Sequence, residues 1–234
     1  MNLIPYESRF KAGEILAEFV LNLNPVIKQI ITNKIERVFL FAIPNGGVPV
    51  AEGFCKVLNI NFDILIVRKI KIPYNTEAGF GSITTDGTVL INEALLSRLN
   101  LSETSIEKSI ETTKREIKER IDFYNRPTDV ESSFNSLINN NYVFIVDDGL
   151  ASGFTMLAAI KMIKNYNPKQ LFIGIPTAPL HTVNRIQDEV DDVYCPNIRK
   201  TSWFAVADAY KHWYDVPESE VLDIMKRSKF YLRE

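Results

Sequence analysis

Four short runs of almost uninterrupted apolar residues are the feature that most restricts how this chain can fold. They are rich in β-branched and aromatic side chains, and they cover residues 37–43, 62–67, 142–146 and 171–175. A strand covered on both faces is apolar throughout, whereas a half-exposed strand alternates apolar and polar residues. The runs therefore predict mainly parallel strands with helices on both faces, which is an α/β fold.

The segments between these runs predict the remaining elements. Apolar residues recur at helical spacing over residues 6–22, 48–58, 92–99, 103–124, 154–165, 179–187 and 218–226. The Asp86-Gly87 pair lies between the β-rich residues 81–84 and 88–91, which predicts a hairpin. Residues 125–141 are polar and rich in Asn and Ser, so they predict a connecting loop.

Composition excludes several classes of function. The 27 Lys and Arg residues are balanced by 29 Asp and Glu residues, so the chain lacks the positive surplus that is typical of a nucleic-acid binder. Its two cysteines, Cys55 and Cys195, and its two histidines, His181 and His212, do not have the spacing of zinc ligands. A small anionic substrate stays open, because it needs only a few cations and backbone amides.

The length and the N-terminus predict a single cytoplasmic domain. A chain of 234 residues suits one large domain, which we expect to cover residues 1–234 with a core at about 35–190. The first residues do not combine a basic stretch with a sustained apolar core, and no window approaches the roughly 18 apolar residues of a membrane span. We therefore expect no membrane partner.

Residues 143–156, VFIVDDGLASGFTM, are the most informative segment. An apolar strand leads into Asp147 and Asp148, then a loop of small and hydroxyl-bearing residues, then an amphipathic helix. Unpaired amides at a helix start favour a phosphate monoester. Adjacent carboxylates can accept hydrogen bonds from two sugar hydroxyls and favour a sugar carbon that becomes cationic. The segment predicts a sugar-phosphate site; the alternative is that the two acids merely end a strand and cap a helix.

This segment resembles the phosphoribosyl pyrophosphate (PRPP) binding motif of type I phosphoribosyltransferases. The resemblance implies a three-layer fold, with a central mainly parallel sheet flanked by helices and a small hood built from the N- and C-terminal segments. It also implies transfer of the phosphoribosyl group to a nitrogenous base, a purine being favoured, with release of pyrophosphate, dependence on Mg2+, a place in nucleotide salvage, and a homodimer. The catalytic residues would be Asp147 and Asp148, and the 5-phosphate would contact Gly149, Leu150, Ala151, Ser152, Gly153 and Thr155.

Two further segments are expected to bind pyrophosphate. Asn45, Gly46 and Gly47 follow the first strand and open a helix, and paired glycines let backbone amides approach an anion. Arg68, Lys69 and Lys71 leave the second strand. Similar basic stretches in the family begin a mobile loop, expected here at about residues 69–80. An ordinary turn and a solvated basic loop are the respective alternatives.

The resemblance narrows to a less characterised branch of predicted phosphoribosyltransferases, whose pattern runs over nearly the whole chain. The matching stretches are residues 8–13, 44–51, 67–81 and 204–221. The branch usually carries Arg where Asn45 stands and Gly where Asp208 stands, so the pyrophosphate loop lacks one cation.

Four other residues receive tentative roles from the resemblance. Glu77 lies in the predicted mobile loop and would orient the base or steady the closed loop, or else be a surface acid. Trp203 and Phe204 would stack on the base, although core packing is the commoner fate of such residues. Asp208 would lie near Mg2+, or else be a surface acid in a turn.

Two rival functions stay open. The phosphate site can persist on this fold in a non-catalytic protein that senses PRPP or a nucleotide, and Asn45 favours that alternative. The second rival is a sugar-phosphate hydrolase.

Overall fold

A computed structural model describes residues 4–126, 130–201 and 203–233. The chain divides into two compact units. The first unit consists of Met1–Ile64, Leu137–Gly153 and Asn167–Glu234, and the second of Leu65–Ser136 and Phe154–Tyr166. Each is described by itself, and the predicted extent of a single domain stays a prediction.

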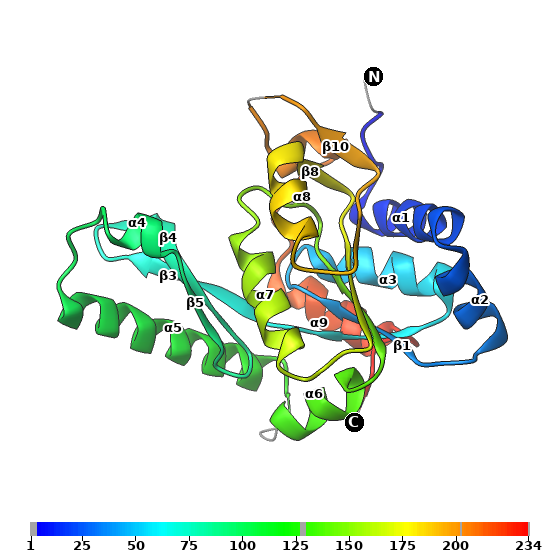
Figure 1. Cartoon of the computed structure of the whole chain (residues 1–234), viewed down its shortest axis with the longest axis horizontal. Helices are drawn as coiled ribbons and strands as arrows, with labels where there is room; N and C mark the ends of the chain where they lie inside the picture. The colour runs from blue at the N-terminus through cyan, green and yellow to red at the C-terminus, as the bar shows by residue number, and fades with distance from the viewer. Residues whose placement is uncertain (1–3, 127–129, 202, 234) are drawn as a thin grey trace. The chain divides into compact units, whose positions relative to one another are not determined.

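A five-stranded parallel sheet forms the centre of the first unit (Figure 1). Its order is β2-β1-β6-β7-β9, and all four neighbouring pairs are parallel. The strands are β1 (Val38–Ala42), β2 (Asn61–Ile64), β6 (Tyr142–Val146), β7 (Gln170–Gly174) and β9 (Asp192–Tyr194). All five residues of β6 are buried, as expected for a central strand covered on both faces. The predicted α/β fold with a central parallel sheet is confirmed.

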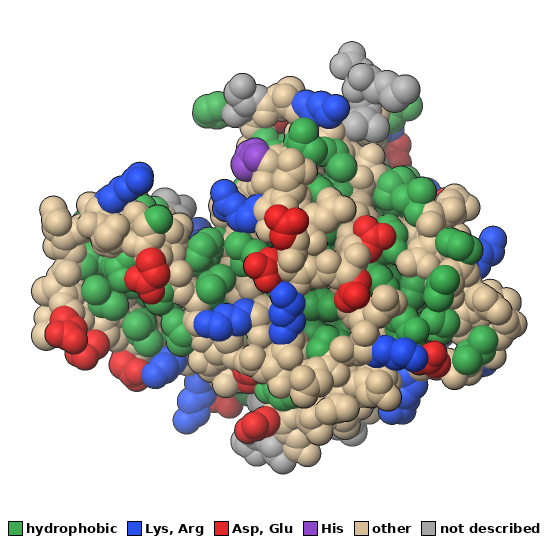
Figure 2. Space-filling model, viewed as in Figure 1, with side chains coloured by type: hydrophobic (Ala, Val, Ile, Leu, Met, Phe, Trp, Pro, Cys, Tyr) green, Lys and Arg blue, Asp and Glu red, His purple; other side chains and the backbone are tan. Residues whose placement is uncertain are grey.

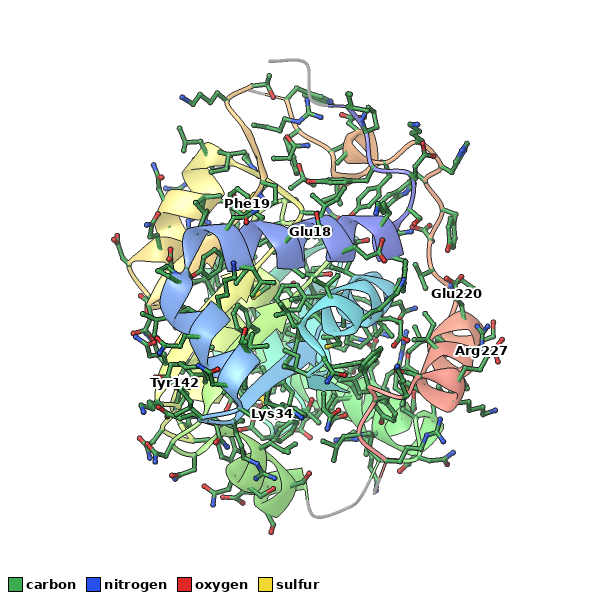
Figure 3. The ribbon with its side chains drawn as sticks, turned by 90° about the vertical axis from the view of Figure 1, so that its right-hand side faces the viewer. Glu18, Phe19, Lys34, Tyr142, Glu220 and Arg227 are labelled. Carbon is green, nitrogen blue, oxygen red and sulfur yellow. The ribbon has the colours of Figure 1, made fainter. Side chains whose placement is uncertain are left out.

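Helices flank this sheet, and two of them pack unusually closely. The helices of the first unit include α1 (Arg9–Leu23), α2 (Pro25–Asn33), α3 (Gly47–Leu58), α8 (Leu180–Gln187) and α9 (Glu218–Arg227). Figure 3 shows α1 and α3 side by side. A Cβ on Gly13 would lie 2.0 Å from the Val50 carbonyl oxygen, and one on Gly53 would lie 2.0 Å from that of Phe10. Only glycine fits at these two positions.

One helix of this unit was not predicted. The expected helix over residues 6–22 begins at Arg9, ends at Leu23 and is followed directly by α2. The Asn24 side chain accepts a hydrogen bond from the Ile27 amide at 2.9 Å, and the two helix axes differ by 106°. An N-cap followed by proline is a strong start signal, so residues 25–33 form a second helix.

Shorter elements complete the first unit. The strands β8 (Thr177–Pro179) and β10 (Asn197–Arg199) form a two-stranded parallel sheet, and η1 (Val206–Ala209) is a single 3-10 turn. Tyr6 forms a parallel bridge with Tyr210, which joins the beginning of the described chain to its last quarter.

The second unit is built on a three-stranded antiparallel sheet of β3 (Val67–Ile72), β4 (Asn75–Thr84) and β5 (Val89–Ile91). Its helices include α4 (Glu93–Leu96), α5 (Glu103–Phe123) and α7 (Phe154–Lys164). The predicted hairpin at Asp86-Gly87 is confirmed as the β4–β5 turn.

Three local predictions are wrong in this part of the chain. The predicted strand over residues 62–67 ends at Ile64, and β3 begins in the other sheet at Val67. The expected mobile loop over residues 69–80 is instead a hairpin, because β3 pairs with β4, with irregular register on both sides of Lys71. Residues 125–141 are not all loop, since α6 (Val130–Ile138) lies within them.

Acidic and basic side chains are interspersed on the visible face of the molecule (Figure 2). This agrees with the balanced composition. Within the described ranges, no single helix has the length and hydropathy to cross a membrane. The helices α1 and α2 have that length and hydropathy only when they are taken together, and they are bent relative to each other.

Candidate active site

The two adjacent acids lie at the carboxyl end of the central strand. Asp147 and Asp148 directly follow Val146, the last residue of β6, and the Asp148 amide donates to Asp147 Oδ1 at 2.8 Å. In open α/β sheets ligands bind at the carboxyl ends of the strands. The acidic pair therefore occupies the expected position for a binding site.

The predicted Asn45-Gly46-Gly47 loop lies against this pair. The Ile43 amide donates to the Val146 carbonyl at 3.0 Å, at the ends of two neighbouring strands. A Cβ on Gly46 would lie 2.1 Å from Asp148 Oδ2, and one on Gly47 would lie 2.9 Å from the Val146 carbonyl oxygen. The structure thus brings two predicted segments together. Because Gly46 has no side chain, the Asp148 carboxylate can lie directly against its backbone.

The small-residue loop after the acids is closely enclosed. Gly153 has φ +75°, a left-handed conformation that favours glycine. A Cβ on Gly149 would lie 2.5 Å from Val206 Cγ1, on η1. The Thr182 hydroxyl of α8 donates to the Ala151 carbonyl at 2.7 Å. The loop is thus enclosed by η1 and α8.

One of the residues predicted to contact the 5-phosphate uses its backbone amide within the protein. The Leu150 amide donates to the Thr177 carbonyl at 3.1 Å, so it is already used within the backbone. The Ser152 carbonyl accepts from Arg185 at 3.1 Å. Thr155 lies in the first turn of α7.

A buried arginine that the sequence reasoning missed is bonded to the acidic pair. Arg9 Nε donates to Asp148 Oδ2 at 2.7 Å, and the two side chains are 5% and 14% exposed. Burial raises the pKa of Asp148, while Arg9 opposes that rise. Burial, and then the charge of Asp148, raise the pKa of Asp147 well above its usual range. Burial thus raises the pKa of both carboxyls, and Arg9 opposes that rise.

The aromatic residues that contact Arg9 differ from the two that were predicted to stack on the base. Trp203 is 86% exposed and Phe204 is half-buried. Tyr210, Trp213 and Tyr214 instead surround the Arg9 guanidinium. One signal in the sequence could have found Arg9 and the three aromatic residues. Residues 8–13 and 204–221 resemble one branch of the family, but that resemblance assigns no role to any of the four.

The predicted basic residues and Glu77 lie in the second unit. On β3, Arg68 is half-buried, whereas Lys69 and Lys71 are exposed. Lys71 Nζ lies 3.3 Å from Glu116 Oε1, on α5, so this lysine has an acidic neighbour within its own unit. Glu77 lies within β4, and its side chain is outside the part that the structure describes.

The described side chains do not form a metal cage of their own. Asp208 is exposed on η1, and among the described residues no group of three or more His, Cys, Asp or Glu side chains is placed to hold an ion. Mg2+ is usually bound through substrate phosphates and one or two carboxylates rather than by an all-protein cage. The residues present fit an ion that arrives with a phosphate-bearing substrate.

Comparisons with known proteins agree with this geometry. A family model described as "Phosphoribosyl transferase domain" matches residues 11–214. The Mycobacterium tuberculosis protein named "Putative phosphoribosyl transferase Rv0571c" is 26% identical over 223 residues, covering 95% of this chain and 47% of that protein. The chain thus spans about half the length of the relatives it matches. The crystal structure of TT1426 from Thermus thermophilus has a TM-score of 0.72 at 23% identity, over 95% of this chain and 98% of that one, which shows a shared fold.

Proposed function

This chain belongs to the phosphoribosyl transferase domain family, and on that premise we propose that it is a PRPP-dependent phosphoribosyltransferase. The proposed reaction moves the 5-phosphoribosyl group of PRPP to a nitrogenous base, a purine being favoured, and releases pyrophosphate. One observation carries the proposal: the acidic pair Asp147-Asp148, at the end of the central strand, lies against the Gly46 loop and leads into an enclosed small-residue loop.

The acidic pair would act on the ribose. The carboxylates of Asp147 and Asp148 accept hydrogen bonds from two adjacent ribose hydroxyls and stabilise the positive charge that builds on the ring as the bond from C1 to pyrophosphate weakens. Small residues from Gly149 to Gly153 hold the 5-phosphate far from C1. Binding energy from that remote group helps to place C1 for attack by the base.

The leaving group needs positive charge. The Asn45-Gly46-Gly47 loop, in which the Gly47 amide already donates to the Ile43 carbonyl at 3.1 Å, and the cations Arg68, Lys69 and Lys71 would bind pyrophosphate oxygens. Asp208 would lie near the metal. Mg2+, when bound, neutralises part of the pyrophosphate charge. Trp203 and Phe204 stay predicted as base contacts, and the homodimer and the cytoplasmic location likewise stay predictions.

A second candidate function is a protein that senses PRPP or a nucleotide without transferring the ribosyl group. Asn45 favours it, because this residue is neutral where the resembling branch usually carries Arg. Its side-chain amide donates to the Val216 carbonyl at 2.8 Å, within the protein. This candidate keeps the phosphate site and loses the chemistry.

The function is tested by pyrophosphate release. Purified protein is given PRPP with each of a panel of purines, pyrimidines and small amines, with Mg2+ or with a chelator. We expect release that requires both Mg2+ and one of the bases. Release without any base would indicate a hydrolase, and calorimetric binding of PRPP without release would indicate the sensor. If PRPP neither bound nor reacted, the proposed function would be wrong.

We expect Arg68→Ala combined with Lys69→Ala to weaken PRPP binding by about 10²-fold or more, because each charge-assisted bond to a phosphate contributes about 1.5–3 kcal/mol. Isothermal titration calorimetry at two salt concentrations measures the effect. The matched control is Lys114→Ala with Lys118→Ala, two exposed lysines of α5 in the same unit, which should leave the affinity unchanged. Wild-type affinity in the β3 variant would remove both residues from the site.

A further inference from the structure

Arg9, the first residue of α1, is held beside the acidic pair by three aromatic rings as well as by a carboxylate. Its Nε donates to Asp148 Oδ2 at 2.7 Å. The guanidinium carbon lies 4.2 Å from the ring centroid of Trp213, 5.2 Å from that of Tyr214 and 5.4 Å from that of Tyr210. We call these three rings the aromatic cage. A guanidinium within about 6 Å of ring centroids is attracted by their quadrupoles.

The aromatic cage is itself anchored to the rest of the first unit. The Tyr210 hydroxyl donates to the Asp148 carbonyl at 2.5 Å, and Tyr210 is bridged to Tyr6. The Tyr214 hydroxyl donates to Oε1 of Glu220 at 2.8 Å, on the helix α9, where Figure 3 labels that residue. Segments from both ends of the chain therefore fix where the guanidinium lies.

Among the residues that the structure describes, three ionisable groups face Asp148. They are Arg9 from α1, the neighbouring Asp147, and Tyr210 from the segment after η1. Burial, and then the charge of Asp148, raise the pKa of Tyr210, so its hydroxyl stays protonated and acts as a donor. Arg9 lowers the pKa of both carboxyls, and for Asp148 its hydrogen bond and its charge are the two largest causes after burial. Arg9 thus supplies the positive charge that favours an ionised Asp148.

We propose that Arg9 is a positioning residue of this site, which holds the Asp148 carboxylate charged and fixed in orientation. The inference rests on the proposed function for its role in the transfer reaction. A buried ion pair contributes little net stability, because desolvation of the two charges offsets their attraction. A carboxylate that must meet developing positive charge, in contrast, gains from being charged and preorganised.

The experiment compares Arg9→Met, Arg9→Lys and Trp213→Leu with a control, Lys11→Met. Methionine keeps an apolar stem, lysine keeps the charge without the planar fork, and leucine loosens the aromatic cage. Lys11 is an exposed cation on the same helix, bonded to Glu14. The readouts are the pH profile of kcat/KM for PRPP and a 13C-carboxylate NMR titration of Asp148 in protein without substrate.

We expect Arg9→Met to raise the pKa of Asp148 by about 1 to 3 pH units, the usual effect of losing an adjacent opposite charge. Ionisation then requires a higher pH, so the acidic limb of the kcat/KM profile moves up by a similar amount. The value of kcat should fall more than KM rises, because the carboxylate acts mainly in the transition state. Arg9→Lys should restore part of the shift, Trp213→Leu should reproduce a fraction of it, and Lys11→Met should match the wild type.

A purely structural arginine gives a different result. If Arg9→Met lowers the melting temperature but leaves both the acidic limb and the NMR titration at wild-type positions, the inference is overturned. If that variant does not fold, Arg9→Lys and Trp213→Leu decide by the same readouts. If the wild type transfers no phosphoribosyl group, the proposed function fails. The NMR titration still decides whether Arg9 holds Asp148 ionised: an unchanged pKa in Arg9→Met would refute it, and a raised pKa would support it.

Discussion

Asp147→Asn is expected to make the fold more stable at neutral pH and to lower turnover about 10²–10³-fold, the usual cost of removing one preorganised electrostatic group. The folded protein raises the pKa of Asp147, so between the unfolded and the folded pKa the native state binds more protons than the unfolded chain. The stability contributed by this carboxyl is therefore largest at low pH and is lost as the pH rises through that window. Asparagine does not ionise and avoids that loss, and relief of a strained functional site commonly adds about 0.5–2 kcal/mol.

Asp148→Asn is expected to lower turnover as well, but to destabilise the fold. This substitution leaves the buried Arg9 guanidinium without its counter-charge, at a cost of about 3–5 kcal/mol. Thermal unfolding at pH 5 and pH 8 and steady-state kinetics measure both quantities. Asp188→Asn, at an exposed acid that follows α8, is the control and should change neither. If the two site variants shifted the melting temperature in the same direction, the different effects expected from burial at Asp147 and from the Arg9 ion pair at Asp148 would be wrong.

The main sheet was predictable because its strands are buried on both faces. The runs at residues 37–43, 142–146 and 171–175 are apolar throughout and became β1, β6 and β7. The hairpin at Asp86-Gly87 was equally clear, since few dipeptides adopt the required turn. Signals of this kind are local, and they do not depend on which other segments pack nearby.

The helices that were missed bury few residues each. In α2 the buried side chains are Ile27 and Ile30, and the helical start signal at Asn24-Pro25 was the better clue. In α6 Phe134 and Ile138 are buried, one turn apart, in a stretch that also holds three serines and an asparagine. Helices of nine residues are too short to establish a clear period, so tertiary packing decided these segments.

The β3–β4 hairpin was mistaken for a mobile loop because the charged residues of β3 make its alternation of buried and exposed residues hard to recognise. Lys69 and Lys71 are exposed, while Val67, Ile70 and Ile72 are buried. The connection at residues 73–74 lacks the glycine that marks a tight hairpin turn. A resemblance to mobile loops in a family therefore gave the wrong conformation, although the in-and-out alternation was present in the sequence.

The site was only partly predictable. The acidic pair and the loop after it are contiguous in sequence and share one motif. Arg9 and Asp148 are 139 positions apart, and no local sequence pattern connects the two positions. The fold joins them because α1 packs on α3, whose first residue, Gly47, lies against the same acids.

Gly46→Ala is expected to lower turnover about 10²-fold, because a displacement of about 1 Å in a catalytic group has an effect of that size. The new Cβ would lie 2.1 Å from Asp148 Oδ2, where no carbon and oxygen atoms can remain. The carboxylate has to move, and its 2.7 Å bond to Arg9 is then broken or bent. Overpacking of this kind also costs about 1–3 kcal/mol of stability.

Gly174→Ala is the matched control for this variant, since it adds the same methyl group to β7, in the same sheet. Its Cβ would meet side-chain atoms of Leu16 and Val146 at 3.2 Å, and side chains can shift by a few tenths of an ångström. Stability should fall modestly and turnover should be retained. Steady-state kinetics and thermal unfolding separate the two variants. The added methyl group forces the Asp148 carboxylate out of its present position. Wild-type turnover in Gly46→Ala would therefore show that catalysis does not need the carboxylate at that position.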